Sequence, residues 1–583
     1  LARTTAVEAG PGTGKTRTLV ERILYMIQEQ RISPAEITAV TFTNRAAGEM
    51  EKRIHSRLPG KRGLKRMKIG TFHSICYRML KETGLKAVLL QESEQLEIAE
   101  EVICELGLKQ KPSQLLEEIS RQKTGERVVC EDGADGLEQA CRRYQERLEE
   151  LNGMDYDDIL LKAVKALEEG KMDEKPFRYL LVDEFQDVSS LQYRLIRLMN
   201  RRGRQLFVIG DPDQSIYGFR GSDSRIFERL SRDEPELCRI RLEENYRSSG
   251  HIVHAARELI RHNPGPERGL WTRKEAGTPL RLVSAASEMS EAIFAAKEIN
   301  RMVGGIDMLD AQEGFGPSEE KKTRSFGDIA VIYRTHRQGE FLERCLCQEG
   351  IPYIVAGREE FLQADSVRGS LSFFSCLAGE ESQLTRPLCR KLLWKDREPE
   401  DGEWEQLTAE FLPLYQKQKP GKFLEAWVRR MGFQEDGPME KFCSMAPFYR
   451  TMKEMAEAVR YGGESDLKRC GQKTYASDAV TLTTIHGAKG LEFPAVILFG
   501  ARKGLIPLET KRGETDEEEE RRLFFVGVTR AMEELVITSS KEPSVFLAEL
   551  PKEDRLSEQT GRREKKGQEH QMSLFELDPS FGK

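Results

Sequence analysis

The sequence lacks any long apolar stretch. No run of about eighteen apolar residues occurs in it, which excludes a membrane-spanning helix of the usual kind. The N-terminus also lacks the basic-then-apolar segment of a secretory signal. The eleven cysteines are scattered, with Cys345 and Cys347 the closest pair, and no C-x-x-C occurs. We interpret them as reduced thiols, not as disulfides or metal ligands, and expect a cytoplasmic protein without a membrane partner.

An excess of positive charge is also missing. The chain has 91 Lys and Arg against 97 Asp and Glu, a formal net charge of −6. Taken alone, this balance argues against a nucleic-acid partner. The groups that bind phosphates act locally, however, and a basic groove can lie on an acidic protein. Net charge therefore leaves the partner open.

Short apolar segments alternate with long helical patterns, which predicts an α/β protein. With 583 residues the chain is too long for one core, so we expect several domains. Several apolar segments are continuous, as in strands buried on both faces of a parallel sheet. They fall into two groups. The predicted strands are Ile37–Phe42, Tyr179–Val182, Leu206–Ile209, Ile329–Tyr333, Val480–Thr484, Ala495–Phe499 and Leu535–Thr538.

A charged, strand-poor segment interrupts each group of strands. The simplest architecture has two sheet domains, each with a mainly helical insertion. A strand begins within about five residues of Leu1, from which we expect a truncated N-terminus. The polar tail is expected to be disordered. The predicted segments are 1–77 and 165–240 for the first sheet domain, 78–164 for its insertion, 241–369 and 479–550 for the second sheet domain, 370–478 for its insertion, and 551–583 for the tail.

A glycine-rich loop with a lysine follows the first expected strand and precedes a helical pattern. In this context of a P-loop, backbone N–H groups surround the β-phosphate, Lys15 reaches the β- and γ-oxygens, and the Thr16 hydroxyl binds Mg²⁺. The strict pattern has Gly where this chain has Ala9. A chance lysine in a glycine-rich turn is the alternative, which the flanking strand and helix disfavour. The predicted nucleotide contacts are Ala9, Gly10, Pro11, Gly12, Thr13, Gly14, Lys15, Thr16 and Arg17.

An acidic pair ends a later apolar strand. Asp183 is placed to hold Mg²⁺, and Glu184 to polarise the attacking water. Such pairs are fairly common by chance. Together with the P-loop, this pair indicates hydrolysis of the nucleotide and not binding alone.

The acidic pair also belongs to a set of motifs that resembles the UvrD/Rep/PcrA type of superfamily 1A DNA helicases. The set spans most of the chain in the order found in that family. The resemblance implies two RecA-like P-loop NTPase domains with parallel sheets. The matching segments are Thr41–Ala47 (motif Ia), Gly70–Ser74 (Ib), Asp183–Asp187 (II), Gly210–Gly221 (III), Asn245–Ser248 (IV), Thr484–Phe493 (V) and Glu519–Ala531 (VI).

For the nucleotide, the resemblance implies that ATP bridges the two sheet domains. Arg247 and Arg530, from the second half of the chain, would be arginine fingers that neutralise the γ-phosphate. Gln214 would sense that phosphate, Tyr246 would stack on adenine and Glu492 would contact the ribose. For Arg247, a surface salt bridge is the alternative. Hydrolysis would remove the bridge and open the cleft.

For DNA, the resemblance implies a single-strand track of rings that stack on bases and donors that hold phosphates. For any one aromatic side chain, core packing is the alternative. A capping or core role is the alternative for the two histidines of the set. The family usually has Trp at Phe219 and Lys at Arg45. The implied track residues are Phe42, Thr43, His73, Tyr217, Phe219, Arg220 and His486.

The chain also departs from the family. The upstream adenine motif is absent, and the second insertion is shorter than in well-known relatives, in which it swivels. We expect an ATP-dependent 3′→5′ helicase, monomeric or weakly dimeric, that acts on single-stranded and tailed duplex DNA in repair or replication restart. The alternatives are a translocase that displaces proteins with little unwinding, and a repair adaptor with a vestigial ATPase.

The tail contains Gln571-Met572-Ser573-Leu574-Phe575, which closely resembles the pentapeptide by which bacterial proteins bind the β sliding clamp. A short peptide in a polar tail can be captured by a preformed pocket. Five-residue patterns also occur by chance. We expect Gln571, Leu574 and Phe575 to make the contacts if the peptide binds.

Overall fold

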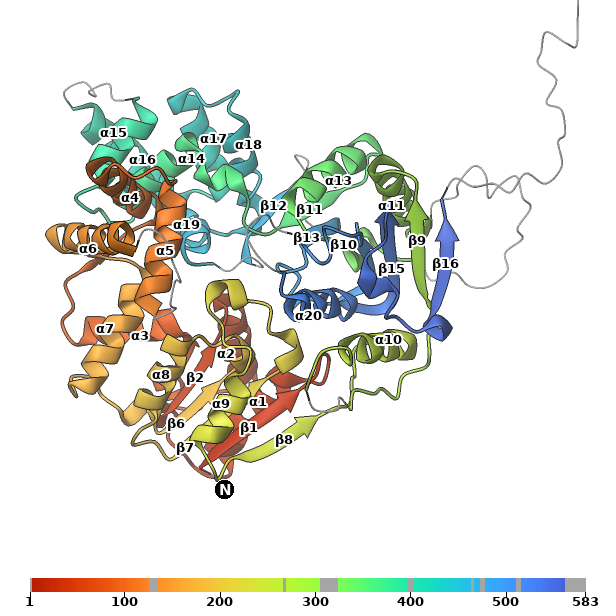
Figure 1. Ribbon diagram of the computed structural model, residues 1–583. Coiled ribbons are helices and arrows are strands. Elements are labelled where there is room, and N and C mark those ends of the chain that lie inside the picture. The colour runs from red at the N-terminus through yellow and green to blue at the C-terminus, as the bar shows by residue number, and fades with distance from the viewer. Residues whose placement is uncertain are drawn as a thin grey trace, which may run out of the picture.

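The computed structural model describes residues 3–124, 134–265, 269–304, 323–395, 402–462, 466–471, 478–509 and 515–560. Two sheets and two helical regions make up this part of the chain (Figure 1). The first sheet has six parallel strands in the order β3-β2-β6-β7-β1-β8. Their bounds are β1 Thr4–Ala9, β2 Ile37–Thr41, β3 Lys68–Thr71, β6 Tyr179–Val182, β7 Gln205–Gly210 and β8 Cys238–Leu242.

The second sheet has eight strands in the order β12-β11-β13-β10-β14-β15-β9-β16. Among its pairs only β11–β12 is antiparallel within the described ranges. All seven predicted strands form, three of them with the predicted bounds and three longer than predicted, while the strand at Ile37 ends one residue earlier; the α/β prediction is confirmed. The bounds are β9 Leu280–Ala285, β10 Ile329–Tyr333, β11 Tyr353–Ala356, β12 Lys468–Cys470, β13 Val480–Thr484, β14 Phe493–Phe499, β15 Ala531–Ser540 and β16 Arg555–Gln559.

Helices cover both faces of each sheet, which is why the central strands are apolar throughout. On the first sheet, α1 and α2 pack on one face, and α3, α7, α8 and α9 on the other. Helices α10, α11, α13 and α20 pack on the second sheet. The bounds are α1 Lys15–Gln28, α2 Asn44–Arg57, α3 Phe72–Glu82, α7 Tyr156–Glu168, α8 Ser190–Met199, α9 Ile226–Asp233, α10 Gly250–Ile260, α11 Glu288–Met302, α13 His336–Gln348 and α20 Glu517–Val528.

Two helical insertions extend from the sheets at the upper left of Figure 1. The first has its own apolar core, and a two-stranded sheet of β4 (Val88–Leu89) and β5 (Gly153–Met154) closes its base. The second has a separate core rich in aromatic side chains. The helices are α4 Glu92–Leu106, α5 Pro112–Thr124 and α6 Ala134–Glu150 in the first, and α14 Asp365–Leu377, α15 Thr385–Leu393, α16 Glu403–Lys417, α17 Pro420–Met431, α18 Gly437–Cys443 and α19 Met452–Tyr461 in the second.

The predicted domain boundaries differ from the structure in three places. Strand β8 pairs with β1 as far as Leu242, two residues past the predicted end of the first sheet domain. Helices α3 and α7 pack in the core of the first sheet, although the end of α3 and most of α7 were assigned to the insertion. The prediction of disorder from residue 551 is wrong for residues 552–559, because β16 pairs with β9 and Glu558 forms an ion pair with Arg281 at 2.7 Å. Gln571, Leu574 and Phe575 lie outside the described residues.

The two insertions contact one another through α4 and the segment from α14 to α15, which we call the insertion contact. Glu94 of α4 is buried there, and its carboxylate accepts hydrogen bonds from the hydroxyls of Ser382 and Thr385. Gln91 Nε2 donates to Ser375 Oγ at 2.7 Å. Leu384 packs in the apolar core of the first insertion. The insertions therefore form a second connection between the halves of the chain.

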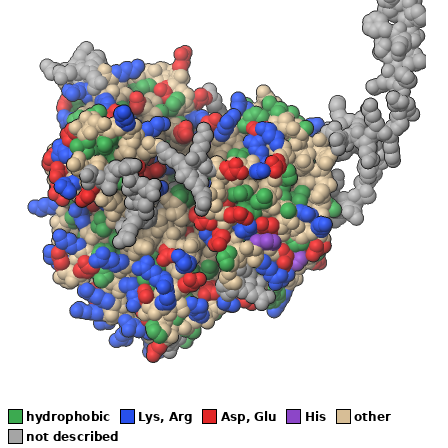
Figure 2. All heavy atoms as spheres, viewed as in Figure 1, with side chains coloured by type: hydrophobic (Ala, Val, Ile, Leu, Met, Phe, Trp, Pro, Cys, Tyr) green, Lys and Arg blue, Asp and Glu red, His purple; other side chains and the backbone are tan. Residues whose placement is uncertain are grey.

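Charge is distributed unevenly over the surface. Figure 2 shows Lys and Arg gathered over α7 and α8 at the lower left, and carboxylates gathered near α20. The first turn of α20 consists of Glu517, Glu518, Glu519 and Glu520. Within the described part of the chain we find no helix whose length and hydropathy would let it span a lipid bilayer.

Candidate nucleotide and DNA site

The P-loop joins the end of β1 to the start of α1. Gly12 and Gly14 have φ angles of 68° and 87°, a left-handed conformation that glycine adopts without strain. Lys15 Nζ donates to the carbonyl of Ala9 at 3.2 Å and lies 3.9 Å from Asp211 Oδ2. A Cβ at Gly12 would stand 2.7 Å from Cβ of Arg247. The loop therefore needs glycine both for its shape and for the close approach of the second half of the chain.

Carboxylates gather beside Lys15 at the carboxyl ends of β6 and β7. Asp183 Oδ1 accepts from the backbone N–H of Glu184 at 3.0 Å, and Gln186 Nε2 donates to Glu184 Oε2 at 2.6 Å. Glu184 has a φ of 48°, an uncommon conformation for a side chain of its size. The backbone thus holds this carboxylate in one fixed orientation.

Burial changes the pKa values of these acids. It raises the pKa of Asp183, with a further contribution from Glu184, and raises that of Asp211 to about 6. For Glu184 burial acts in the same direction, but Lys15 and Lys489 outweigh it and hold its pKa below the usual value. A buried group of carboxylates is stable when a cation shares the site. Within the described residues no three such side chains converge as metal ligands, so Asp183 offers a hard divalent ion one carboxylate oxygen of the kind it prefers.

The segment after β8 binds the P-loop directly from the other side of the cleft. Asn245 Nδ2 donates to the Pro11 carbonyl at 2.7 Å, and the Tyr246 N–H donates to the Gly12 carbonyl at 2.9 Å. The ring of Tyr246 is 62% exposed. It is thus placed beside the P-loop with a face open to a ligand.

Arg247 bridges the P-loop and the second sheet. Its Nε donates to Glu492 Oε2 at 2.6 Å, and its Nη1 donates to the carbonyl of Thr529 at 3.2 Å. Arg247 thus forms a salt bridge, which was the alternative to a role at the γ-phosphate. Its partner is Glu492, the residue expected to contact the ribose. Glu492 therefore positions Arg247 in this state.

Arg530 lies on the second sheet and is 2% exposed. Its guanidinium donates to the carbonyls of Val526 and Leu491 and to the Thr529 hydroxyl. Burial and the neighbouring charge of Arg247 lower its pKa to about 9, while Glu184, Glu492 and Asp211 oppose that change. The charges of Arg530 and Arg247 thus lie close enough to repel one another, an arrangement that an anion near both would stabilise.

Gln214 belongs to the same network. Its Nε2 donates to Asp211 Oδ2 at 2.8 Å, and the Asp211 N–H donates to Gln186 Oε1 at 2.9 Å. The structure therefore brings most of the predicted catalytic side chains to one cleft. They are Lys15, Asp183, Glu184, Gln214, Arg247 and Arg530.

Sequence reasoning gave no role to Lys489, which connects the two halves inside the cleft. Its ammonium donates to both carboxylate oxygens of Asp187 at 2.7 and 2.6 Å and to the Gln214 carbonyl at 2.7 Å. It also lies 4.8 Å from the ring centroid of Tyr217. Two sequence features could have indicated this role: Lys489 is a basic residue in motif V, and Asp187 is an acidic residue in motif II.

Four of the predicted track residues form an aromatic cluster, defined here as Phe42, Tyr217, Phe219 and His486. Phe42 stacks on Tyr217 at 5.3 Å between ring centroids, and Phe219 meets His486 edge-on at 5.4 Å. Phe219 is 53% exposed, whereas Tyr217 is buried beneath its neighbours. For Tyr217 the packing alternative therefore describes its environment, while Phe42 and Phe219 present faces to solvent.

The other predicted track residues lie differently. Thr43 caps α2, because its hydroxyl accepts from the Ala46 N–H at 3.1 Å. His73 packs edge-on against Tyr156, and burial lowers its pKa to about 4, so its ring is neutral at pH 7. The side chain of Arg220 lies outside the described residues.

A cavity of about 540 Å³ extends from the aromatic cluster over the second sheet. Phe219 and His486 line it together with Arg334, Thr335 and His336, which follow β10. Sequence reasoning missed these three residues. The sequence could have indicated them, because three polar side chains directly follow a predicted strand. Ligands of parallel sheets bind at the carboxyl ends of the strands.

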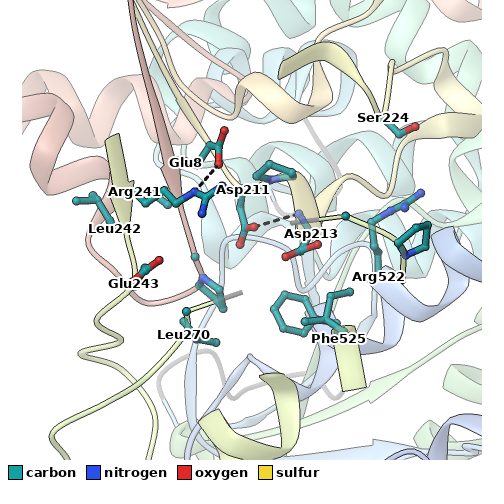
Figure 3. A pocket seen from close by; sticks show the side chains of 18 of the residues that line it. Glu8, Asp211, Asp213, Ser224, Arg241, Leu242, Glu243, Leu270, Arg522 and Phe525 are labelled. Carbon is teal, nitrogen blue, oxygen red and sulfur yellow. Dashed lines mark hydrogen bonds and ion pairs between the residues drawn. The ribbon is translucent and has the colours of Figure 1, made fainter. Parts of the chain in front are cut away.

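A larger cavity of about 690 Å³ opens between the sheets beside the P-loop (Figure 3). Glu8 and Arg241, an ion pair at 3.3 Å, lie on its first-sheet side, and Arg522 and Phe525 of α20 on the other. Ala9, Gly10 and Pro11 also line it, so it borders the back of the loop.

Comparison with known families identifies the chain. The family model described as UvrD/REP helicase N-terminal domain matches residues 1–235. The UvrD-like helicase C-terminal domain matches residues 240–395 and 436–542. The chain belongs to the UvrD/REP helicase family. It is a DNA-dependent ATPase of the helicase type, with ATP as its nucleotide and DNA as its partner.

Its relatives include proteins described as ATP-dependent DNA helicase PcrA. That of Staphylococcus epidermidis is 28% identical over 642 residues, which cover 96% of this chain and 85% of the relative. That of Staphylococcus aureus is 27% identical over 643 residues, covering 96% and 86%. The similarity thus extends through both sheet domains.

Proposed function

We propose that this protein moves 3′→5′ along single-stranded DNA and separates duplexes, in DNA repair or replication restart. The observation that carries the motor proposal is the position of Arg247 and Arg530. Arg247 follows the last strand of the first sheet and Arg530 precedes β15 of the second sheet, and both lie near the acids or the P-loop of the first sheet domain. A nucleotide that contacts both halves would stabilise the closed cleft, and its hydrolysis would remove that stabilisation.

Each residue of the cleft then has a separate role in ATP binding and hydrolysis. Lys15 and the P-loop N–H groups bind the β- and γ-phosphates, Arg247 and Arg530 neutralise the charge that develops on transfer, and Gln214 contacts the γ-phosphate. Glu184, held by Gln186, orients and deprotonates the attacking water. Thr16 and Asp183 would hold Mg²⁺, which would offset the negative charge of the phosphates. Tyr246, with Arg17, would hold adenine.

Coupling to DNA runs through Lys489. Its ammonium bonds Asp187 and the Gln214 carbonyl and lies close to the ring of Tyr217. A change at Gln214 when the γ-phosphate leaves would thus reach the aromatic cluster through one side chain. The bases of the strand would stack on Phe42 and Phe219, with His486 beside them.

The test is a strand-displacement assay on duplexes with 3′ or 5′ single-stranded tails, with Lys15→Ala as the inactive control. Unwinding of the 3′-tailed duplex alone supports the proposal. Unwinding of the 5′-tailed duplex alone would reverse the polarity. ATP hydrolysis without any stimulation by single-stranded DNA would instead favour the vestigial adaptor.

A translocase that displaces proteins with little unwinding is the second candidate. The family model of the C-terminal domain leaves residues 396–435, within the second insertion, unmatched. Rapid displacement of a bound protein from single-stranded DNA, with no strand separation on either tailed duplex, would favour it.

We also propose that Gln571, Leu574 and Phe575 tether the motor to the sliding clamp, and that the protein acts as a monomer or weak dimer in the cytoplasm. Clamp capture by the whole chain but not by a Leu574→Ala/Phe575→Ala variant is the expected result. Equal capture by both proteins would refute the tether.

A further inference from the structure

Aromatic residues continue beyond the aromatic cluster along the carboxyl edge of the first sheet. Phe42 follows β2 and His73 follows β3, and these strands pair in parallel with Thr41 opposite Thr71. Neighbouring strands lie about 4.8 Å apart, so the chain positions of Phe42 and of His73, in the first turn of α3, start from neighbouring strand ends. His73 in turn meets Tyr156 at 5.2 Å between ring centroids. The series thus leads from the cluster to the start of α7.

Tyr156 lines a cavity of about 250 Å³ at the contact between the two insertions. The other walls come from the start of α4, from α14 and α19, and from the loop after β11 (Figure 1). Three arginines, Arg358, Arg368 and Arg460, line the cavity, against one carboxylate, that of Glu92. Its lining therefore favours an anion, and its volume suits one unit of a nucleic-acid strand.

The three arginines differ in how far the protein satisfies them. Arg358 pairs with Glu92, and Arg460 pairs with Glu380. Arg368, whose side chain is 17% exposed, donates to the Ser93 carbonyl at 3.2 Å and lies 3.8 Å from the nearest carboxylate oxygen.

The Nε–H of Arg368 is buried and has no acceptor among the described residues. A buried guanidinium N–H without an acceptor is rare in folded proteins, because its desolvation is costly. Of the three arginines, Arg368 also has the most distant carboxylate partner, so it is the one whose guanidinium is most available to an anion in the cavity.

We propose that the DNA single strand continues from the aromatic cluster past His73 and Tyr156 into this cavity, where Arg368 donates to a backbone phosphate. The proposal rests on the DNA motor function and adds a subsite to it. Phosphate fits because the planar N–H fork of arginine matches its oxygens. Tyr156 supplies a ring for a base. The bound strand would touch both insertions.

The test measures affinity for fluorescent oligothymidylates of increasing length. The variants are Arg368→Ala and Arg368→Lys, with Arg429→Ala as the matched control. Arg429 lies on α17 of the same insertion, pairs with Glu425 at 3.2 Å and is 75% exposed. All proteins should bind short strands, which cover only the aromatic cluster, with equal affinity. This equality also shows that the variants are folded.

On long strands Arg368→Ala should lose roughly tenfold in affinity, as for a charged hydrogen bond, whereas the control should not change. The slope of log affinity against log salt should fall by about one. Arg368→Lys keeps the charge and should lose less. Equal affinity of all proteins at every length would overturn the subsite, as would a loss that is independent of length. Failure of the unaltered protein to bind any strand would overturn the DNA function itself.

Discussion

Two connections join the halves of this protein, and they differ in chemistry. The cleft holds buried charges that are only partly compensated, with Arg247 beside Arg530 and Asp183 beside Glu184. The insertion contact holds a carboxylate, Glu94, whose oxygens are bonded to hydroxyls and to a backbone N–H. The cleft is therefore incomplete without a charged ligand, whereas the Glu94 carboxylate at the insertion contact already has its hydrogen-bond donors.

This difference indicates which connection responds to ATP. A ligand shifts an equilibrium only through contacts that differ between two states. Like charges that lie close together in the cleft repel one another unless an anionic ligand is bound, so the ligand favours the closed state. The hydrogen bonds of Glu94 form without the ligand and supply no such difference. We expect the cleft to open and close while the insertion contact persists. Four variants test this comparison, in order of decreasing effect.

Arg530→Ala should lower the rate of DNA-stimulated ATP hydrolysis by on the order of a thousandfold, because the γ-phosphate loses a cation from the second sheet. Nucleotide should still bind, since the P-loop is intact. Turnover and nucleotide affinity measured on the same preparation check this, with Arg429→Ala, an exposed arginine of α17, as the control. A turnover close to normal in Arg530→Ala would refute the bridge between the sheets.

Lys489→Ala should leave the buried carboxylate of Asp187 unpaired and destabilise the protein by about 3–5 kcal/mol. The side chains of the pair are 8% and 0% exposed. Stimulation of hydrolysis by DNA should fall more than basal hydrolysis. Urea unfolding and hydrolysis with and without DNA measure both effects. Lys489→Met/Asp187→Asn should recover the stability but not the stimulation; recovery of both would remove Lys489 from the coupling.

Glu94→Ala should cost about 2 kcal/mol, because it leaves the buried Thr385 hydroxyl, the half-buried Ser382 hydroxyl and a backbone N–H without their acceptor. The rate of ATP hydrolysis per DNA-bound molecule should not change. Glu100→Ala, at the exposed rim of the same contact, should change the stability by less than about 0.5 kcal/mol. An altered hydrolysis rate in Glu94→Ala would show that the insertion contact also moves with ATP.

His73→Gln should have the smallest effect, visible only in the pH dependence of stability. Burial lowers the pKa of His73 from 6.5 to about 4, so below 6.5 the unfolded chain binds a proton that the folded protein does not. The unaltered protein should therefore lose stability between pH 6.5 and pH 4, and His73→Gln should lose less. Unfolding midpoints across this window, with the half-buried His55→Gln as control, provide the test; parallel curves would contradict it.

Much of the fold followed from local patterns. Continuous apolar segments such as Ile329–Tyr333 predicted buried strands correctly, because burial on both faces leaves no room for alternation. Strand β8 was missed because its side chains are mostly exposed at the edge of the sheet. Strand β16 was missed because it is polar, and its place depends on β9, which lies far away in the chain.

The candidate site divides in the same way. Lys15, Asp183 and Glu184 follow from motifs in which chemistry and spacing are local. Lys489 and Arg368 do not, because their roles depend on partners that the fold brings near: Asp187 for one, and the walls of a cavity between two insertions for the other. For Glu492 the motif predicted a contact with the ribose, but it could not predict the salt bridge with Arg247 that the structure shows.

The sequence by itself determined that this chain holds a nucleotide at a P-loop, because a phosphate site of glycine, lysine and backbone N–H groups forms within a few residues. Only the tertiary structure decided which charges share the cleft and which stay apart. Coulomb interactions and burial depend on distance in space, and the distance along the chain from Lys15 to Arg530 says nothing about them.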